Sequence, residues 1–150
     1  MAKRNDNDIA VFKVPDKQYE NGFKLTQFPY SIGKSSELEY DDLVYLVGNP
    51  FMIGTNIRQG HISMKDYISK GFYNKSEIIS SLPVSPGDSG GPVLAVRDYS
   101  FELVGLQKSV LQKNNNISMF IGIDTIIESI KTNSLDQLAE DLNSRQYQNF

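Results

Sequence analysis

The 150-residue chain contains no cysteine, no tryptophan and a single histidine, His61. Without cysteine the chain can form neither disulfide bonds nor thiolate metal sites, and one histidine gives little basis for a zinc site. We therefore expect no metal and no cofactor. The lack of cysteine fits a reducing compartment. It slightly favours the cytoplasm but does not determine where the protein is located.

Long apolar runs and a strong excess of one charge are also missing. Hydrophobic residues make up 39% of the chain and charged residues 22%, and the formal net charge is −3. This balance is typical of one globular domain with a core, and it gives no electrostatic reason to expect a nucleic acid partner. No segment approaches the length of a membrane span, and residues 1–6 lack the apolar region of a signal peptide. We therefore expect no membrane partner.

Six short stretches have the β-branched and aromatic content of strands, and turns with glycine, proline or polar residues separate them. They cover residues 43–47, 57–64, 77–82, 91–96, 102–109 and 118–123. This number and spacing predict an all-β domain built as a small antiparallel barrel. A further apolar run, residues 8–14, predicts a buried strand without a local hairpin partner.

The C-terminal part of the chain predicts helices. Asp124 is placed to cap an amphipathic helix that has Ile126, Ile127 and Ile130 on one face. Residues 134–137, Ser-Leu-Asp-Gln, form a capping-box pattern before a second helix, whose role the sequence leaves open.

The most informative segment is Pro-Val-Ser-Pro-Gly-Asp-Ser-Gly-Gly-Pro at residues 83–92. Glycine in such a run permits positive φ, and consecutive amides in a tight turn can hold negative charge. Ser89 beside them has what acyl transfer requires, a nucleophile with donors for an oxyanion. Gly-x-Ser-x-Gly also occurs in α/β-hydrolases, where a helix and a later histidine follow it. Here residues 92–96 predict a strand and no histidine follows, so we reject that reading.

The segment Gly-Asp-Ser-Gly-Gly-Pro at residues 87–92 resembles the active-site serine segment of the chymotrypsin-like, trypsin-fold serine proteases. The match continues through residues 93–96 and 101–106, and the lead-in at 80–86 is most similar to the disulfide-free bacterial HtrA-type branch. The resemblance implies that residues 43–123 form the C-terminal six-stranded barrel of a serine endopeptidase. It also implies that Ser89 attacks a polypeptide substrate to form an acyl-enzyme, and that the Gly87 and Ser89 amides form the oxyanion hole.

A second match comes earlier in the chain. Asn-Asp-Ile-Ala-Val-Phe-Lys at residues 7–13 resembles the segment that carries the triad aspartate in this family, which implies that Asp8 orients a catalytic histidine. The implied organisation is the last part of an incomplete first barrel at 1–15 and a crossover at 16–42. The second barrel with its C-terminal helix then covers 43–132, and an extra helix and tail cover 133–150.

The triad histidine has no candidate at the expected place. The family order is histidine, aspartate, serine, and only seven residues precede Asp8. His61 lies in a predicted strand after Asp8, so we expect it to be an ordinary strand residue and not the base. We therefore expect the chain to be the C-terminal part of a protease, with little activity alone. A missing segment or a separate chain would supply the first barrel.

The resemblance also implies a primary specificity pocket. Its base would include Pro83 and Val84, and its wall would include Lys108, Ser109 and Val110. Because Pro83 stands where trypsin has an aspartate, we expect a preference for small or medium apolar residues over Lys or Arg. Lys108 falls where most relatives place a small hydroxyl residue. It could pair with Asp8, or a one-residue shift could place Ser109 there.

A rival interpretation is a pseudoprotease, a barrel that binds a peptide in its groove without cutting it. The missing histidine favours this rival, and the intact serine segment favours an enzyme. A Ser89→Ala substitution that left all function intact would favour the binding module.

Overall fold

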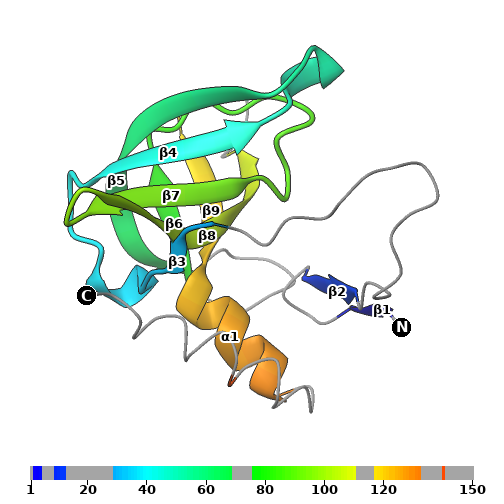
Figure 1. The fold of residues 1–150 in the computed structure, drawn as a ribbon, viewed down its shortest axis with the longest axis vertical. Coiled ribbons are helices and arrows are strands. Elements are labelled where there is room, and N and C mark those ends of the chain that lie inside the picture. The colour runs from blue at the N-terminus through cyan, green and yellow to red at the C-terminus, as the bar shows by residue number, and fades with distance from the viewer. Residues whose placement is uncertain are drawn as a thin grey trace.

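The computed structural model describes residues 2–4, 9–12, 29–68, 76–110, 117–132 and 140. Figure 1 shows one barrel of strands with a single labelled helix, α1, below it. The barrel strands are β4 (Leu43–Gly48), β5 (Asn56–Ile68), β6 (Ser76–Ser80), β7 (Pro92–Arg97), β8 (Ser100–Val110) and β9 (Ser118–Gly122). All six strands predicted from the sequence are present.

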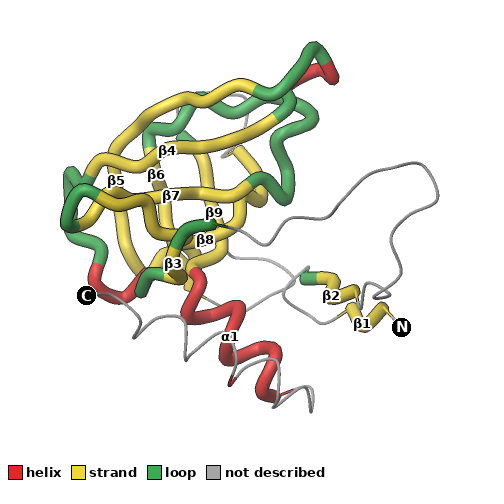
Figure 2. Tube along the Cα trace, in the orientation of Figure 1, coloured by secondary structure: helices red, strands yellow, loops and turns green. Residues whose placement is uncertain are grey.

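The six strands close on themselves. The strands follow the order β8-β7-β4-β5-β6-β9, and each strand is antiparallel to the next one in this order. Strand β9 also pairs with β8, which closes the barrel. The tube drawing in Figure 2 shows these strands surrounding one interior. The predicted six-stranded antiparallel barrel is therefore confirmed.

The barrel interior is filled by aliphatic side chains and one phenylalanine. Strand β4 shows the period of two that places alternate residues inside, because Val44 and Leu46 are fully buried while Leu43 is exposed. Phe120 of β9 is the largest fully buried side chain. The remaining members of this core are Leu38, Ile62, Ile78, Leu82, Val84, Val93, Ala95 and Val104. These residues form one hydrophobic core inside the barrel.

A second apolar cluster lies between the barrel and the helix α1 (Ile123–Thr132). The three predicted isoleucines, Ile126, Ile127 and Ile130, are all buried in it. Asp124 does not cap the helix as predicted, because it lies inside the first turn. Instead its amide donates to the hydroxyl of Ser35 (3.2 Å), so the cap comes from a residue far away in the chain.

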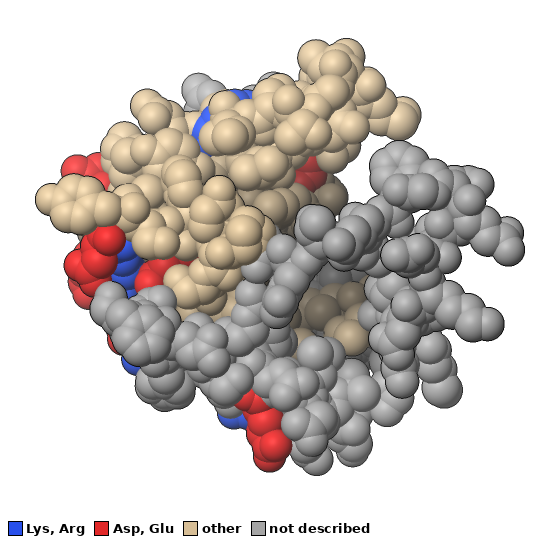
Figure 3. Space-filling view, viewed as in Figure 1, with Lys and Arg blue, Asp and Glu red and all other residues tan. Residues whose placement is uncertain are grey.

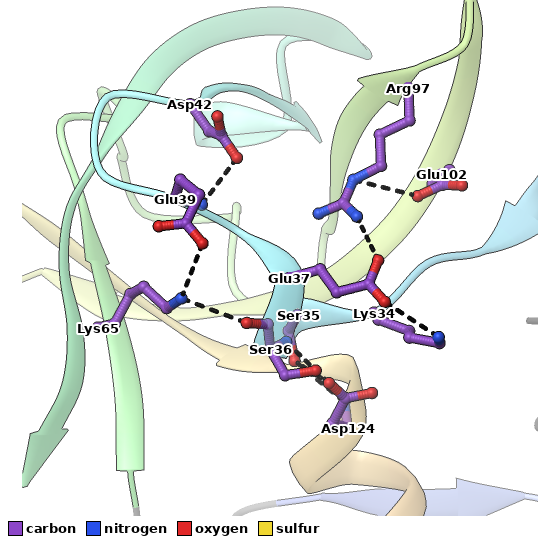
Figure 4. Close-up of polar contacts among 10 residues, drawn as sticks. All are labelled: Lys34, Ser35, Ser36, Glu37, Glu39, Asp42, Lys65, Arg97, Glu102 and Asp124. Carbon is purple, nitrogen blue, oxygen red and sulfur yellow. Dashed lines mark hydrogen bonds and ion pairs between the residues drawn. The ribbon is translucent and has the colours of Figure 1, made fainter.

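Ser35 belongs to a short segment that crosses the end of the barrel. This segment holds β3 (Ser31–Ile32), which pairs in parallel with β8, and the 3-10 helix η1 (Ser35–Glu37). Figure 4 shows the polar network that attaches the segment, in which Arg97 contacts Glu37 (2.7 Å) and Glu102 (3.6 Å). These contacts fix the segment and α1 to the barrel.

The N-terminal strand differs from the prediction. Of the predicted run 8–14, the structure describes residues 9–12. Within them β2 (Ala10–Phe12) pairs antiparallel with β1 (Ala2–Arg4). The expectation of no local hairpin partner was therefore wrong, because residues 2–4, although two of them are charged, can pair through their backbone. Ile9 is buried in the cluster around α1, which provides the apolar contacts that the isolated strand lacked.

Several predictions fall outside the described residues. These are Asp8, the first part of the crossover, the second helix after Ser134 and the terminal segment 143–150. Within the described ranges, no helix is both long and apolar enough to cross a bilayer.

Candidate active site

The serine segment is the loop that joins β6 to β7. Strand β7 begins at Pro92, directly after the glycines, so no helix follows Ser89 and the α/β-hydrolase reading is excluded. Gly87 and Gly90 have positive φ, +101° and +81°, which other residues adopt only with strain. A Cβ at Gly87 would lie 2.5 Å from the carbonyl oxygen of Asn49, so this position also lacks room for a side chain.

Neighbouring side chains of this loop point in opposite directions. Asp88 is fully buried, whereas Ser89 is exposed. The Ser89 hydroxyl donates to the carbonyl oxygen of Lys108 in β8 (3.2 Å). The nucleophile predicted from the sequence therefore lies at the surface, anchored to the strand beside it.

The backbone amides of the loop fall into two groups. The amides of Asp88, Gly90 and Gly91 donate to backbone carbonyls at 2.8–3.1 Å. For Gly87 and Ser89, no hydrogen-bond acceptor is found among the residues that the structure describes. These two are the amides that the resemblance assigns to the oxyanion hole.

The Asp88 carboxylate is held by an arginine that the sequence reading did not single out. Arg58 of β5 donates to both carboxylate oxygens (2.5 and 2.7 Å), and it also donates to the carbonyl oxygen of Pro83 (2.9 Å). The amide of Ser85 gives the carboxylate a further hydrogen bond (2.7 Å). Burial raises the pKa of Asp88, but the hydrogen bonds from Arg58 and Ser85 outweigh it and the pKa lies below its usual value.

One signal in the sequence indicates that Arg58 points inward. Within β5, Arg58 shares its strand face with the buried Gly60 and Ile62, so the period of two directs it inward.

The same period places His61 on the other face of β5. His61 is exposed, its amide donates to the hydroxyl of Ser81 (2.9 Å), and its register partner is Leu43 of β4. In the described part of the chain, no contact joins His61 to Ser89. This position agrees with its interpretation as an ordinary strand residue.

Lys108 is an inserted residue in the pairing of β8 with β9. Gln107 pairs with Phe120 and Ser109 pairs with Met119, so β8 has one more residue than β9 between these two pairs. This places a β-bulge at Lys108. Its ammonium group forms an ion pair with Glu77 of β6, which is 6% exposed. The second oxygen of Glu77 has no hydrogen-bond partner in the described structure. From the sequence we predicted that Lys108 could pair with Asp8. We did not predict its pairing with Glu77.

A cavity of about 390 Å³ lies next to Ser89. It is lined by residues of the serine loop, of β8 and β9, and of β2 with the residue before it, namely Ile9, Ala10, Ser89, Gly90, Leu106, Gln107, Lys108 and Ile121. Ile9 directly follows Asp8 in the chain. The segment that the sequence assigned to the triad aspartate therefore approaches Ser89, while Asp8 itself is outside the described residues.

The predicted specificity residues lie in several environments. Val84 is buried in the barrel core, and Val110 packs against the same core. Pro83 is exposed, and its carbonyl oxygen accepts the bond from Arg58. Lys108 lines the cavity at Ser89, and Ser109 is half-buried beyond the bulge.

The comparisons with known proteins identify the family and the fold. The family profile described as "Trypsin-like peptidase domain" matches residues 1–106. A protein of Chlamydia pneumoniae named "Probable periplasmic serine endoprotease DegP-like" is 28% identical over 137 residues, which are 89% of this chain and 25% of that protein. "Protease Do-like 1, chloroplastic" of Arabidopsis thaliana is 27% identical over 128 residues, 81% of this chain and 27% of the relative.

Solved structures with the same fold include an HtrA-type protease, AlgW, with a bound tripeptide. It has a TM-score of 0.62 at 22% identity over 73% of this chain and 37% of that chain. The structure of Deg5 has a TM-score of 0.60 at 25% identity over 82% of this chain and 53% of that one. The chain thus spans about a quarter of the length of the curated relatives quoted above.

Proposed function

The chain belongs to the trypsin-like peptidase domain family, and we propose on this basis that it is the serine-bearing part of an endopeptidase that cuts polypeptides through an acyl-enzyme on Ser89. The observation that carries the proposal is the loop itself. It presents an exposed Ser89 beside two amides, those of Gly87 and Ser89, that have no acceptor within the described chain. Solved HtrA-type structures with bound peptides support a peptide as the ligand.

In this mechanism a histidine takes the Ser89 proton as the hydroxyl attacks the peptide carbonyl. Asp8 orients that histidine, and the Gly87 and Ser89 amides stabilise the oxyanion of the tetrahedral intermediate. The cavity between β2 and β8 has the volume to receive an imidazole ring next to Ser89. The histidine would come with the first barrel, from another segment or a separate chain. The residue before the cut bond would be small or medium-sized and apolar.

The second candidate function is a binding module that holds a peptide without cutting it. The specific observation in its favour is the position of His61, the only histidine, on the outer face of β5. This residue offers no base to Ser89, so the chain alone would have a barely activated serine.

A labelling experiment with imidazole as a substitute base separates the two functions. The chain is incubated with an alkyl fluorophosphonate, and the adduct on Ser89 is measured by mass spectrometry. We expect slow labelling that imidazole accelerates, and no adduct at this position in Ser89→Ala. If the unmodified chain and Ser89→Ala are labelled to the same extent, both with and without imidazole, the enzyme proposal is wrong and the binding module is supported.

A further inference from the structure

We propose that an exposed apolar tip on the β4–β5 connection binds the part of the substrate polypeptide that follows the cut bond, and that it favours apolar side chains there. The apolar tip consists of Phe51, Met52, Ile53 and Ile57. The inference rests on the proposed function, because it takes the peptide to cross Ser89. It adds a contact with the substrate that is separate from the predicted specificity pocket.

The side chains of the apolar tip stand far out of the barrel. They are between 64% and 87% exposed, and they come from the connection after β4 and the start of β5. Figure 2 shows this connection projecting from the barrel, with the 3-10 helix η2 (Pro50–Met52) as a short helical segment. Residues 49–57 include no charged residue. Single exposed apolar residues are ordinary, but a group of them within one short stretch is typical of a binding surface for an apolar ligand.

The backbone that carries the apolar tip is strained. Phe51 and Met52 have positive φ, 52° and 58°, which bulky side chains adopt only at a cost. At Asp98 and Tyr99, positive φ is the ordinary geometry of the two-residue turn between β7 and β8. The connection at 49–55 is longer, so this explanation does not apply to it. Strain that also exposes apolar side chains does not serve the stability of the barrel, and such strain commonly marks a functional surface.

The apolar tip adjoins the serine loop. The Phe51 amide donates to the carbonyl oxygen of Pro86 (2.7 Å), and a Cβ at Gly87 would lie 3.2 Å from the same Phe51 nitrogen. Further along the loop, the Ser89 hydroxyl donates to the carbonyl oxygen of Lys108 in β8 (3.2 Å). The loop therefore touches η2 at the residue whose amide is assigned to the oxyanion, and it touches β8 at the nucleophile.

These two contacts give the direction of the bound peptide. The residue before the cut bond belongs to the predicted specificity pocket, whose wall is at 108–110 in β8. An extended peptide that begins along β8 and places its carbonyl oxygen at the Gly87 amide then continues away from β8. In the barrel, β7 separates β8 from β4, which leads into η2. The segment after the cut bond is thus the part of the substrate that meets the apolar tip.

Two matched peptides test this contact by binding, which does not require the missing histidine. Both carry valine before the cut bond. One carries phenylalanine and leucine in the two positions after it, and the other carries serine in both. Dissociation constants for the unmodified chain are measured by fluorescence anisotropy. We expect the apolar peptide to bind at least about tenfold more tightly, because it buries part of two apolar side chains on the tip.

A double variant, Phe51→Asn with Met52→Asn, removes the two strained apolar side chains of the tip. Asparagine tolerates positive φ, so we expect the fold to be kept, as checked by circular dichroism. The two peptides should bind this variant with affinities within about twofold of each other. Tyr99→Asn is the matched control and should keep the full preference. Tyr99 is an exposed aromatic residue with positive φ, at the end of β7 away from the serine loop.

A photo-reactive peptide locates the contact in the unmodified chain. Benzoylphenylalanine in the second position after the cut bond should form adducts within residues 51–57, identified by mass spectrometry. Adducts found only outside this stretch would overturn the inference. So would a lack of binding, equal binding of the two peptides, or a preference that survives in the double variant.

The labelling of Ser89 with imidazole decides the proposed function separately. If Ser89 is labelled but the chain does not distinguish the two peptides, the enzyme proposal stands and only the role of the apolar tip is lost. If the chain distinguishes the peptides but Ser89 is never labelled, the enzyme proposal fails and the apolar tip is a contact surface of the binding module.

Discussion

The two sides of Ser89 are built in different ways. On the side of Asp88 and Arg58, the barrel supplies every contact, and the amides, the buried carboxylate and its arginine all belong to described residues. On the side of Lys108 there is a cavity of about 390 Å³, bordered by the strand that follows Asp8. In the proposed mechanism, the barrel supplies the amides for the oxyanion, and the group that takes the Ser89 proton would occupy this cavity.

The serine loop is held by the barrel itself. Arg58 of β5 holds the Asp88 carboxylate, and backbone hydrogen bonds join Pro86 to Phe51, and Gly90 and Gly91 to Gln107 of β8. Figure 3 shows that the upper surface of the barrel carries few charged side chains in this view. Phe51 and Met52 are exposed apolar residues of the 3-10 helix η2 (Pro50–Met52), and the Phe51 amide donates to the carbonyl oxygen of Pro86 in the serine loop (2.7 Å).

The largest expected effect comes from leaving one buried charge without its partner. Arg58→Gln leaves the Asp88 carboxylate unpaired at 0% exposure, so the free energy of unfolding should fall by about 3–5 kcal/mol. Urea denaturation followed by circular dichroism measures this loss. Lys34→Gln removes the ammonium group that lies 3.0 Å from the half-exposed Glu37, and it should cost less because solvent screens that pair. Equal losses in the two variants would remove the contrast between the buried and the exposed pair.

A smaller effect is expected from the backbone of the loop. Gly87→Ala places a Cβ at φ +101° and 2.5 Å from the Asn49 carbonyl oxygen, so we expect about 1–3 kcal/mol of destabilisation and slower labelling of Ser89. Gly54→Ala is the control, because Gly54 also has positive φ (+118°) but has nothing within 4 Å of the added Cβ. If Gly54→Ala lowers the free energy of unfolding by less and leaves the labelling rate unchanged, the additional effect of Gly87→Ala comes from the clash with Asn49. The contact with Asn49 would be irrelevant if both variants lost the same stability.

The smallest effect is a dependence of stability on pH. Because the pKa of Asp88 in the folded chain lies below its usual value, the unfolded chain binds the proton more readily. The stabilisation is present above the unfolded pKa of about 3.9, and it is lost as the pH falls through the folded value. Urea titrations between pH 2.5 and 6 should show a shallower acid loss in Asp88→Asn than in the unmodified chain. An identical slope in both proteins would contradict the depressed pKa.

Most of the barrel could be predicted from the sequence because its strands are rich in β-branched and aromatic residues and are separated by turns. The serine loop could be predicted because its glycines and Ser89 are consecutive in the chain. Arg58 was missed because it lies thirty positions before Asp88 and its contact depends on how β5 pairs in the closed barrel. The pairing of β2 with β1 was missed because residues 2–4, of which two are charged, do not show the apolar pattern of a strand.

Lys108 illustrates a limit of one-dimensional matching. The sequence left open whether Lys108 or Ser109 occupies the position beside the triad aspartate. The β-bulge between Gln107 and Ser109 makes Lys108 an inserted residue, and its side chain turns to Glu77. A bulge changes register without changing composition, so only the pairing of β8 with β9 reveals it.

The most direct test of the central claim is peptide cleavage by the chain joined to the sequence encoded upstream of it. Sequencing that region should reveal an in-frame segment with a histidine, and the extended protein should cleave a peptide library after small or medium apolar residues. Ser89→Ala in the same protein should abolish the cleavage while leaving the barrel folded. Cleavage that persists in Ser89→Ala, or an extended protein with the histidine that binds peptides without cutting them, would contradict the account.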